Sequence, residues 1–371
     1  MFTRDDTKII KGAAIILMLI HHLWGLPERI AGGSLKYMFT IFGQSSIVYF
    51  GLFGKICVSL FFFVGGYGMY IASQNGRLDI INKLKMLYIS YWKVFVLFIP
   101  MGFLFFSCQP IYCEDSNICN RYAEFQWGEF LQNFLGLRTT YNSEWWFLKS
   151  YVYAIISFPL VKKICDKYTA ITNFTIIIIG SIMVTNVFPA LGNIESIGKL
   201  NNNFLYQAFF CQRAPYIACF WVGGGMAKDG LLIKLQESMK KNKMLNPVLD
   251  IVYFVCIVYL ENTGIGNSLD ILYVPLLIII ILDLTKRLRF AETVLLHIGR
   301  QSTNMWLIHS FFCYYFYRVV VIVVTPRWAF PSLVLLVLFT YAASLFVTYF
   351  WGTGKKVVGI AQRNFYGKSE R

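Results

Sequence analysis

Long apolar segments recur along this chain and limit what it can fold into. Three of them cover roughly residues 171–189, 269–284 and 331–351. Each is long enough to cross the ~30 Å hydrocarbon core of a bilayer as a helix, and none has the alternating pattern of a membrane β-barrel strand. Only 14% of the residues are charged, against about a quarter in soluble domains. The sequence therefore predicts an all-α, polytopic transmembrane helical bundle.

We expect about ten membrane spans, with both termini in the cytoplasm. The spans lie roughly at 8–27, 56–73, 88–107, 144–161, 171–190, 207–227, 247–261, 268–285, 299–322 and 332–351. Most of the 34 lysines and arginines then fall on the side of the termini, as the positive-inside rule requires. The net charge of +15 is thus a topology signal, and no nucleic acid partner is needed to explain it. Residues 1–371 are expected to form a single transmembrane domain with no separate soluble domain.

The nine cysteines show no spacing that is typical of a metal site, and no metal is expected. Five of them lie in predicted spans, where a cysteine behaves as a small apolar residue. Cys108, Cys113 and Cys119 belong to the predicted outer loop 108–143. A disulfide is compatible with that loop, but the sequence leaves the pairing open.

The first predicted span begins and ends with ionisable residues. Residues 11–22 read KGAAIILMLIHH. In a helix, Lys11 and His22 lie on one face, about 16 Å apart along the axis, while His21 points about 80° away. Gly12 and the two alanines after it allow another helix to approach closely. Because ionisable side chains are costly inside a span, these residues are functional candidates.

The residues alone leave two interpretations of His22 open. A neutral imidazole can take a proton from a hydroxyl and return it to a leaving group, or it can be acylated as a nucleophile. Alternatively, His21 and His22 are interfacial residues beside Trp24, solvated by lipid headgroups. The choice depends on features elsewhere in the chain.

Five segments, taken in order, resemble one family of membrane enzymes. They are KGAAIILMLIHHL (11–23), VSLFFFVGGYGMY (58–70), EWWFLKSYV (144–152), QRAPYIACFWVGGGMAK (212–228) and IGRQSTNMWLIH (298–309). Together they are similar to the acyltransferase 3 family, whose first helix carries a basic residue and a histidine at the spacing of Lys11 and His22. The chain departs from the family pattern in three places. It has Lys11 where arginine is usual, Gly65 where serine is usual, and Trp306 in place of a tyrosine.

The resemblance implies a membrane O-acyltransferase. Such an enzyme moves an acyl group, generally acetyl, from cytoplasmic acetyl-CoA to a hydroxyl of an extracytoplasmic or lipid-linked carbohydrate. Its partners are acyl-CoA, a carbohydrate or glycolipid acceptor and the lipid bilayer, and its expected location is the bacterial cell membrane. Another donor, such as succinyl-CoA, stays open, as does the choice between direct transfer and an acyl-histidine intermediate.

Under this interpretation His22 is the catalytic base. The expected catalytic set also contains Lys11, on the same face of the first span, and Ser302 and His309. These last two residues share a face of the ninth span, because seven residues make nearly two helical turns.

Coenzyme A carries phosphates, so its site is expected on the basic cytoplasmic face. Lys11, Lys83, Lys85 and Arg300 are the candidates for charge-assisted contacts with it. Taken one at a time, these charges are also explained by the positive-inside rule.

The candidate acceptor-binding residues are Lys149, Arg213, Glu144, Trp145, Trp146 and Tyr151. Lys149 and Arg213 fall within spans, where they can bind substrate oxygens or pair with carboxylates. Trp145 and Trp146 can stack on a sugar ring, or they can belong to the aromatic belt at the interface.

Two functions other than acyl transfer share part of this pattern. A transporter or flippase for a surface glycolipid or polysaccharide precursor also has many spans and intramembrane charges, but it needs no acyl-CoA pocket. A sensory or accessory membrane protein has little reason to keep Lys149, Arg213, Ser302 and His309 inside its spans. We rank the enzyme first and the transporter second.

Overall fold

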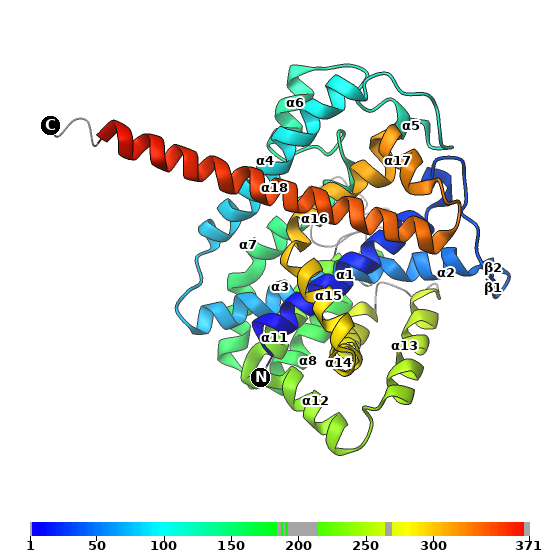
Figure 1. Cartoon of the computed structure of the whole chain (residues 1–371). Helices are drawn as coiled ribbons and strands as arrows, with labels where there is room; N and C mark the ends of the chain where they lie inside the picture. Colours follow the sequence, from blue (N-terminus) through cyan, green and yellow to red (C-terminus); the bar gives the residue numbers. More distant parts are fainter. Residues whose placement is uncertain (1, 184–186, 188–189, 192–213, 264–268, 367–371) are drawn as a thin grey trace.

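The computed structural model describes residues 2–183, 187, 190–191, 214–263 and 269–366. Its regular structure is almost entirely helical (Figure 1). The longer helices are α1 (Arg4–Trp24), α2 (Ser46–Phe53), α3 (Cys57–Gln74), α4 (Ile80–Phe105), α6 (Trp127–Phe134), α7 (Trp146–Lys167), α8 (Ala170–Ile182), α11 (Ala214–Ala227), α12 (Leu231–Lys241), α13 (Pro247–Glu261), α14 (Asp270–Arg287), α15 (Arg289–Arg300), α16 (Ser302–Ser310), α17 (Tyr317–Val324) and α18 (Ala329–Tyr366).

Short elements complete the fold. The strands β1 (Thr40–Ile41) and β2 (Gln44–Ser45) form a small antiparallel hairpin. The single turns are η1 (Pro27–Arg29), η2 (Gly54–Ile56), α5 (Ser116–Cys119), η3 (Ser143–Trp145), η6 (Lys228–Gly230) and the π-helical turn η8 (Phe311–Tyr315).

Helix α1 runs through the middle of the bundle (Figure 1). It packs against α2, α3, α14, α15, α16 and α18. Its crossing with α15 depends on glycine at both contact points. A Cβ on Gly12 would lie 2.1 Å from the Leu295 carbonyl oxygen, and one on Gly299 would lie 1.9 Å from that of Lys8. The close approach expected at Gly12 is therefore confirmed, and it holds α1 firmly in place.

A second close crossing joins α3 to α11. A Cβ on Gly66 would lie 1.9 Å from the Phe220 carbonyl oxygen, and one on Gly223 would lie 2.1 Å from that of Phe63. These distances leave no room for a side chain, so the two backbones touch. Small residues at such crossings are typical of helices packed within a membrane.

The structure supports the prediction that the chain contains membrane-spanning helices. Within the described ranges, four helical segments are long and apolar enough to cross a membrane: Arg4–Trp24, Ser46–Gln74, Ile80–Phe105 and Ala329–Thr353. A bent pair, Ser302–Tyr315 with Tyr317–Val324, makes a fifth. The number of ten spans and the cytoplasmic termini stay predictions.

The expectation of one continuous helix over 299–322 is wrong. Helix α15 ends at Arg300, α16 begins at Ser302, and the chain then bends by 85° between η8 and α17. At the bend, the Phe316 N–H closes a π-type hydrogen bond to the Phe311 carbonyl at 2.8 Å. Side chains from the loop after α4 satisfy neighbouring backbone groups, because Gln109 accepts from the Tyr317 N–H at 2.8 Å and Tyr112 donates to the Tyr314 carbonyl. A broken span is stable when such partners replace the lost helical bonds.

Two other boundaries also differ from expectation. Residues 46–53 were expected to be loop but form α2, which leads through η2 into α3. Helix α4 begins at Ile80 rather than near residue 88, since Asp79 caps it by accepting from the Asn82 N–H at 2.9 Å. Lys83 and Lys85 therefore lie in the first turns of a helix.

The loops at residues 25–45 and 106–142 meet at one end of the bundle. The Gly32 N–H donates to the Tyr112 carbonyl at 3.0 Å, and the Glu114 N–H donates to the Glu28 carbonyl at 3.1 Å. In the second loop the Cys113 and Cys119 sulfurs lie 3.8 Å apart, and both cysteines are free. Of the three cysteines in this loop, Cys113 and Cys119 are thus the two that lie close together, while Cys108 is exposed.

Labelling Cys108 tests the topology. We expect a membrane-impermeant maleimide to modify the protein in intact cells, because Cys108 is exposed on a loop that the charge distribution places outside. Cys119 is buried, and burial raises the pKa of Cys113 to about 12, so neither offers a reactive thiolate. The labelling should disappear in Cys108→Ser. Modification that requires permeabilised cells would place the loop in the cytoplasm.

Candidate active site

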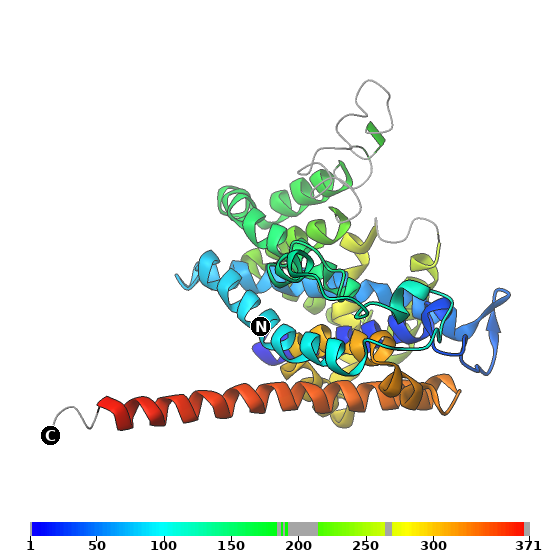
Figure 2. The ribbon, with the colours of Figure 1, turned by 90° about the horizontal axis from the view of Figure 1, so that it is seen from above.

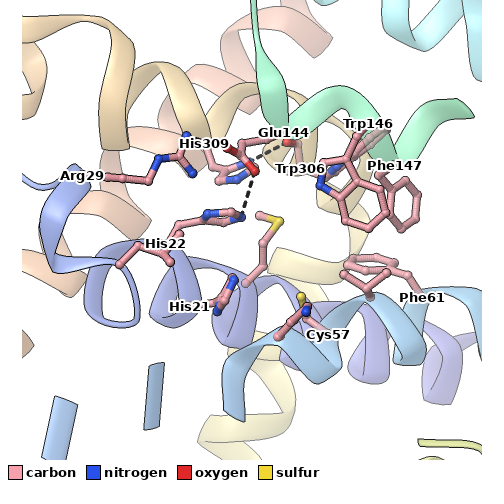
Figure 3. A pocket seen from close by; sticks show the side chains of 14 residues that line it. His21, His22, Arg29, Cys57, Phe61, Glu144, Trp146, Phe147, Trp306 and His309 are labelled. Carbon is pink, nitrogen blue, oxygen red and sulfur yellow. Dashed lines mark hydrogen bonds and ion pairs between the residues drawn. The ribbon is translucent and has the colours of Figure 1, made fainter. Parts of the chain in front are cut away.

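A cavity of about 140 Å³ lies at the C-terminal end of α1, against α3, α7 and α16 (Figure 3). We call it the histidine cavity. Its polar lining residues are His21, His22, Arg29, Lys55, Glu144 and His309. Helix α1 ends just beyond the two histidines, where the Gly25 N–H closes onto the His21 carbonyl at 2.9 Å. The histidine pair thus sits in the final turns of the central helix.

A buried carboxylate stands beside His22. Glu144 Oε2 lies 3.8 Å from His22 Nε2, and Glu144 Oε1 lies 3.0 Å from Arg29 Nη2. Figure 3 shows the three side chains converging from η1, α1 and η3. The carboxylate is 8% exposed. Since a buried charge needs a partner, Arg29 is what allows Glu144 to be ionised there.

The turn that carries Glu144 is fixed to the segment formed by α16 and η8. Asn142 donates to Ser310 Oγ at 2.7 Å, the Ser143 N–H donates to the Tyr315 hydroxyl at 3.2 Å, and the Trp145 indole donates to the Leu307 carbonyl at 3.0 Å. These bonds to one segment set the position of the carboxylate against the cavity.

Tyr314 determines which nitrogen of His22 carries the proton. The tyrosine hydroxyl donates its only proton to the His22 backbone carbonyl at 2.7 Å. At the His22 Nδ1, 3.1 Å away, the same oxygen must then act as acceptor. Neutral His22 therefore holds its proton on Nδ1, which leaves the lone pair of Nε2 directed toward Glu144 and the cavity.

His309 is held in the same tautomer by a different partner. Its Nδ1 lies 2.6 Å from the Trp306 carbonyl, which can only accept, so Nδ1 carries the proton. Its Nε2 is buried without a hydrogen-bond partner among the described residues. The His309 and His22 rings lie 4.8 Å apart. Two imidazoles thus present basic nitrogens in one small cavity.

Arg29 lies in η1, outside the helices. Burial opposes its charge, but Tyr314 and Glu144 outweigh burial and raise the pKa of the guanidinium. The guanidinium also stacks over the Tyr314 ring at 4.1 Å from the ring centre, a favourable cation–π geometry. Arg29 therefore links the carboxylate to the tyrosine that orients His22.

A second cavity, of about 80 Å³, lies further along α1 around Lys11. We call it the lysine cavity. Its polar lining residues are Lys11, Tyr151, Ser302 and Thr303. Gly65 makes room for one of them, because a Cβ at that position would lie 2.3 Å from the Tyr151 hydroxyl oxygen. A serine at this position would require the Tyr151 side chain to shift.

The arrangement permits acid–base chemistry on a hydroxyl. His22 Nε2 is an unprotonated base whose cationic form would be stabilised by Glu144. The rest of the histidine cavity is apolar, with Met18, Val58 and Phe61 on its walls. Low polarity strengthens the effect of the few charges present.

The comparisons with known proteins agree with this chemistry. Residues 6–350 match the model of an acyltransferase domain family. The chain belongs to the acyltransferase 3 family. No curated protein and no solved structure matches it. The family resemblance inferred from the five motifs is thus confirmed over nearly the whole chain, and the protein is a membrane acyltransferase.

The structure divides the expected residues of this acyltransferase into groups. The histidine cavity brings together His22, His309, Glu144 and Trp146. The lysine cavity brings together Lys11, Ser302 and Tyr151. The catalytic and binding roles of these residues stay predictions.

Other expected residues of the acyltransferase lie elsewhere. Lys83, Lys85 and Arg300 are exposed on the surface. Lys149 is half-buried and lines neither cavity. Arg213 lies outside the described residues.

Trp145 does not occupy the position expected of an interfacial tryptophan. It is fully buried, and its ring lies 4.9 Å from the ring of Tyr91. The side chain therefore packs in the core and lines neither cavity, so its expected role of stacking on an acceptor sugar is not supported. No group of three or more His, Cys, Asp or Glu side chains that would suit a metal ion occurs in the described part of the chain.

Sequence reasoning missed Arg29, Tyr314 and a contact of His21. His21 Nδ1 lies 2.8 Å from the Gly51 carbonyl, which places this histidine against α2. Arg29 did carry a signal, since an arginine in a predicted outer loop runs against the positive-inside rule. Tyr314 carried none, because its position depends on the π-helical turn.

Removing Arg29 should destabilise the acyltransferase by about 3–5 kcal/mol, since Glu144 would stay buried without its partner. We expect Arg29→Met to lower the thermal unfolding temperature in detergent. The double variant with Glu144→Gln should recover part of the loss. Arg121→Met is the control, because Arg121 stacks over the Tyr315 ring and forms no ion pair with a carboxylate among the described residues, so its loss should cost less. Equal losses in the two single variants would contradict the buried pair.

Proposed function

We propose that this protein transfers an acetyl group from cytoplasmic acetyl-CoA to a hydroxyl of an extracytoplasmic or lipid-linked carbohydrate in the bacterial cell membrane. The observation that carries the proposal is the His22 Nε2 lone pair, fixed by Tyr314 and facing Glu144 in a buried cavity. Membership of the acyltransferase 3 family supplies the reaction class.

In the proposed reaction His22 acts as the base. Its Nε2 removes the proton from the acceptor hydroxyl while the oxygen attacks the thioester carbonyl. The new C–O bond forms and the C–S bond then breaks. The proton on Nε2 passes to the departing coenzyme A sulfur, so the neutral imidazole is regenerated. Glu144 stabilises the imidazolium in between, since it lies 3.8 Å from the same nitrogen.

His309 and Trp146 are proposed to position the acceptor. The unpaired Nε2 of His309 can accept a hydrogen bond from a second hydroxyl of the carbohydrate. Trp146 lines the same cavity and is half-buried, so part of its ring is available for stacking on a sugar.

Lys11 is proposed to bind the donor side. It is partly buried in α1 and lines a cavity with the hydroxyls of Ser302 and Tyr151. Lys83 lies close enough for its charge to interact with that of Lys11. We propose that these two lysines, with the exposed Lys85 and Arg300, supply the positive charges that the phosphates of coenzyme A contact.

Binding of the donor tests this proposal without knowledge of the acceptor. Purified protein should bind coenzyme A and acetyl-CoA, and Lys11→Ala should weaken binding roughly tenfold, about the worth of one charge-assisted contact. Lys36→Ala is the control, because Lys36 lies in the loop after η1 and not on α1, α4 or α15, the helices that carry the proposed donor-binding residues. If neither acetyl-CoA nor succinyl-CoA binds, the acyl-CoA donor assignment fails, and transport of a glycolipid precursor becomes the alternative to test next.

His22→Gln tests the base. We expect transfer of radiolabelled acetyl from acetyl-CoA into envelope material to fall about 100- to 10,000-fold, while donor binding is retained. His297→Gln is the matched control, because His297 is exposed on α15 and should leave transfer unchanged. Equal transfer by His22→Gln and wild type would exclude His22 as the base.

A further inference from the structure

The histidine cavity and the lysine cavity share three lining residues, and all three are aromatic. Phe61, Phe147 and Trp306 line both. They come from α3, α7 and α16, three helices that meet beside α1. We call these three side chains the aromatic layer. They stand between the proposed base and the proposed donor site.

The rings of the aromatic layer contact one another through Phe147. Its ring centre lies 4.7 Å from that of Trp306 and 6.1 Å from that of Phe61. Phe147 and Trp306 are each 8% exposed, while Phe61 is half-buried. The three rings therefore leave little open space between the two cavities, and Phe61 is the most exposed of the three.

The two sides of the layer differ in chemistry. On one side lie the two histidines and Glu144, and on the other lie Lys11 and the hydroxyl groups of Ser302 and Tyr151. Apart from the indole N–H of Trp306, the layer offers only ring faces and edges to a group that passes between the two cavities. A charged acyl group would lose its hydration there with at most one hydrogen-bond donor and no opposite charge in return. A longer acyl chain would need the rings to separate.

The layer is also connected to the proposed acceptor site. The backbone carbonyl of Trp306 accepts the Nδ1 proton of His309 at 2.6 Å. The residue that holds one side of the layer thus also orients a histidine of the reaction cavity. Movement of the Trp306 backbone would change both together.

Resting on the function proposed above, we propose that the aromatic layer selects the acyl group. Phe61, Phe147 and Trp306 admit a short, uncharged acyl thioester from the lysine cavity to His22, and they reject longer chains and acyl groups that end in a carboxylate. The layer also keeps water on the donor side from reaching the thioester, so hydrolysis is suppressed. These residues determine specificity and do not take part in proton transfer.

The test compares binding of coenzyme A, acetyl-CoA, butyryl-CoA and succinyl-CoA to wild type and Phe61→Ala. Phe61 is chosen because its partial exposure makes the truncation least disruptive. We expect wild type to prefer acetyl-CoA over butyryl-CoA. The ratio of the two affinities should shift by about tenfold or more toward butyryl-CoA in Phe61→Ala, the effect expected for a pocket enlarged by more than one methylene. Affinity for coenzyme A itself should change by the same small factor that any lost contact with the pantetheine arm gives, so the ratio between the two acyl forms is the decisive quantity.

Two further comparisons make the result decisive. Phe346→Ala removes an exposed phenylalanine of α18 that lines neither cavity, and it should leave the affinity ratio as in wild type. Release of free coenzyme A from acetyl-CoA in the absence of acceptor should rise in Phe61→Ala as water gains access.

The outcomes separate the two proposals. If coenzyme A and acetyl-CoA bind but Phe61→Ala keeps the wild-type affinity ratio and hydrolysis rate, the aromatic layer does not select the acyl group, although the acyltransferase assignment stands. If no form of coenzyme A binds wild type, the donor assignment is wrong and the aromatic layer proposal falls with it.

Discussion

The buried contact between Arg29 and Glu144 is the interaction on which the rest of the site depends. A carboxylate that is 8% exposed can stay ionised only with a partner, and the guanidinium 3.0 Å away is that partner. Through Glu144 the pair sets the electrostatic environment of His22, and through the Tyr314 ring it supports the tautomer of the same histidine. One arginine from a short turn thus stabilises two of the side chains that make His22 a base.

The helix break after η8 positions two tyrosines of the same site. By leaving the helical path at Phe316, the chain brings Tyr314 against α1 and Tyr315 against the turn that carries Glu144. The loop after α4 satisfies the freed backbone groups through Gln109 and Tyr112. The loops therefore stabilise the broken helix. Figure 2 shows the loops at the end of the bundle opposite the protruding end of α18.

The sequence was informative where the signal is local and less informative where it depends on tertiary contact. Apolar length and charge bias predicted a helical membrane protein. The spacing of Lys11 and His22 predicted that both lie on one face of the first helix, and the structure places them on two different cavities along that helix. Glu144 was singled out, but its apposition to His22 joins residues far apart in the chain, which no periodicity encodes.

Other differences have identifiable physical causes. The break within 299–322 was missed because a π-helical turn among aromatic residues leaves the apolar pattern unchanged. Trp145 was expected either to stack on a sugar ring or to belong to the interfacial aromatic belt, yet it is fully buried and its indole donates to the Leu307 carbonyl in the core. Arg29 was counted as one of several loop charges, although its place in an outer loop set it apart.

The most direct test of the central claim is a structure of the protein with a thioether analogue of acetyl-CoA, in which the reactive C–S bond cannot be cleaved. The account predicts the nucleotide against Lys11 and Lys83, the pantetheine arm passing the aromatic layer, and the acyl carbonyl inside the histidine cavity beside His22 Nε2, so that an acceptor hydroxyl can contact both. An acyl group bound outside the histidine cavity, with Nε2 of His22 facing only Glu144, would contradict it.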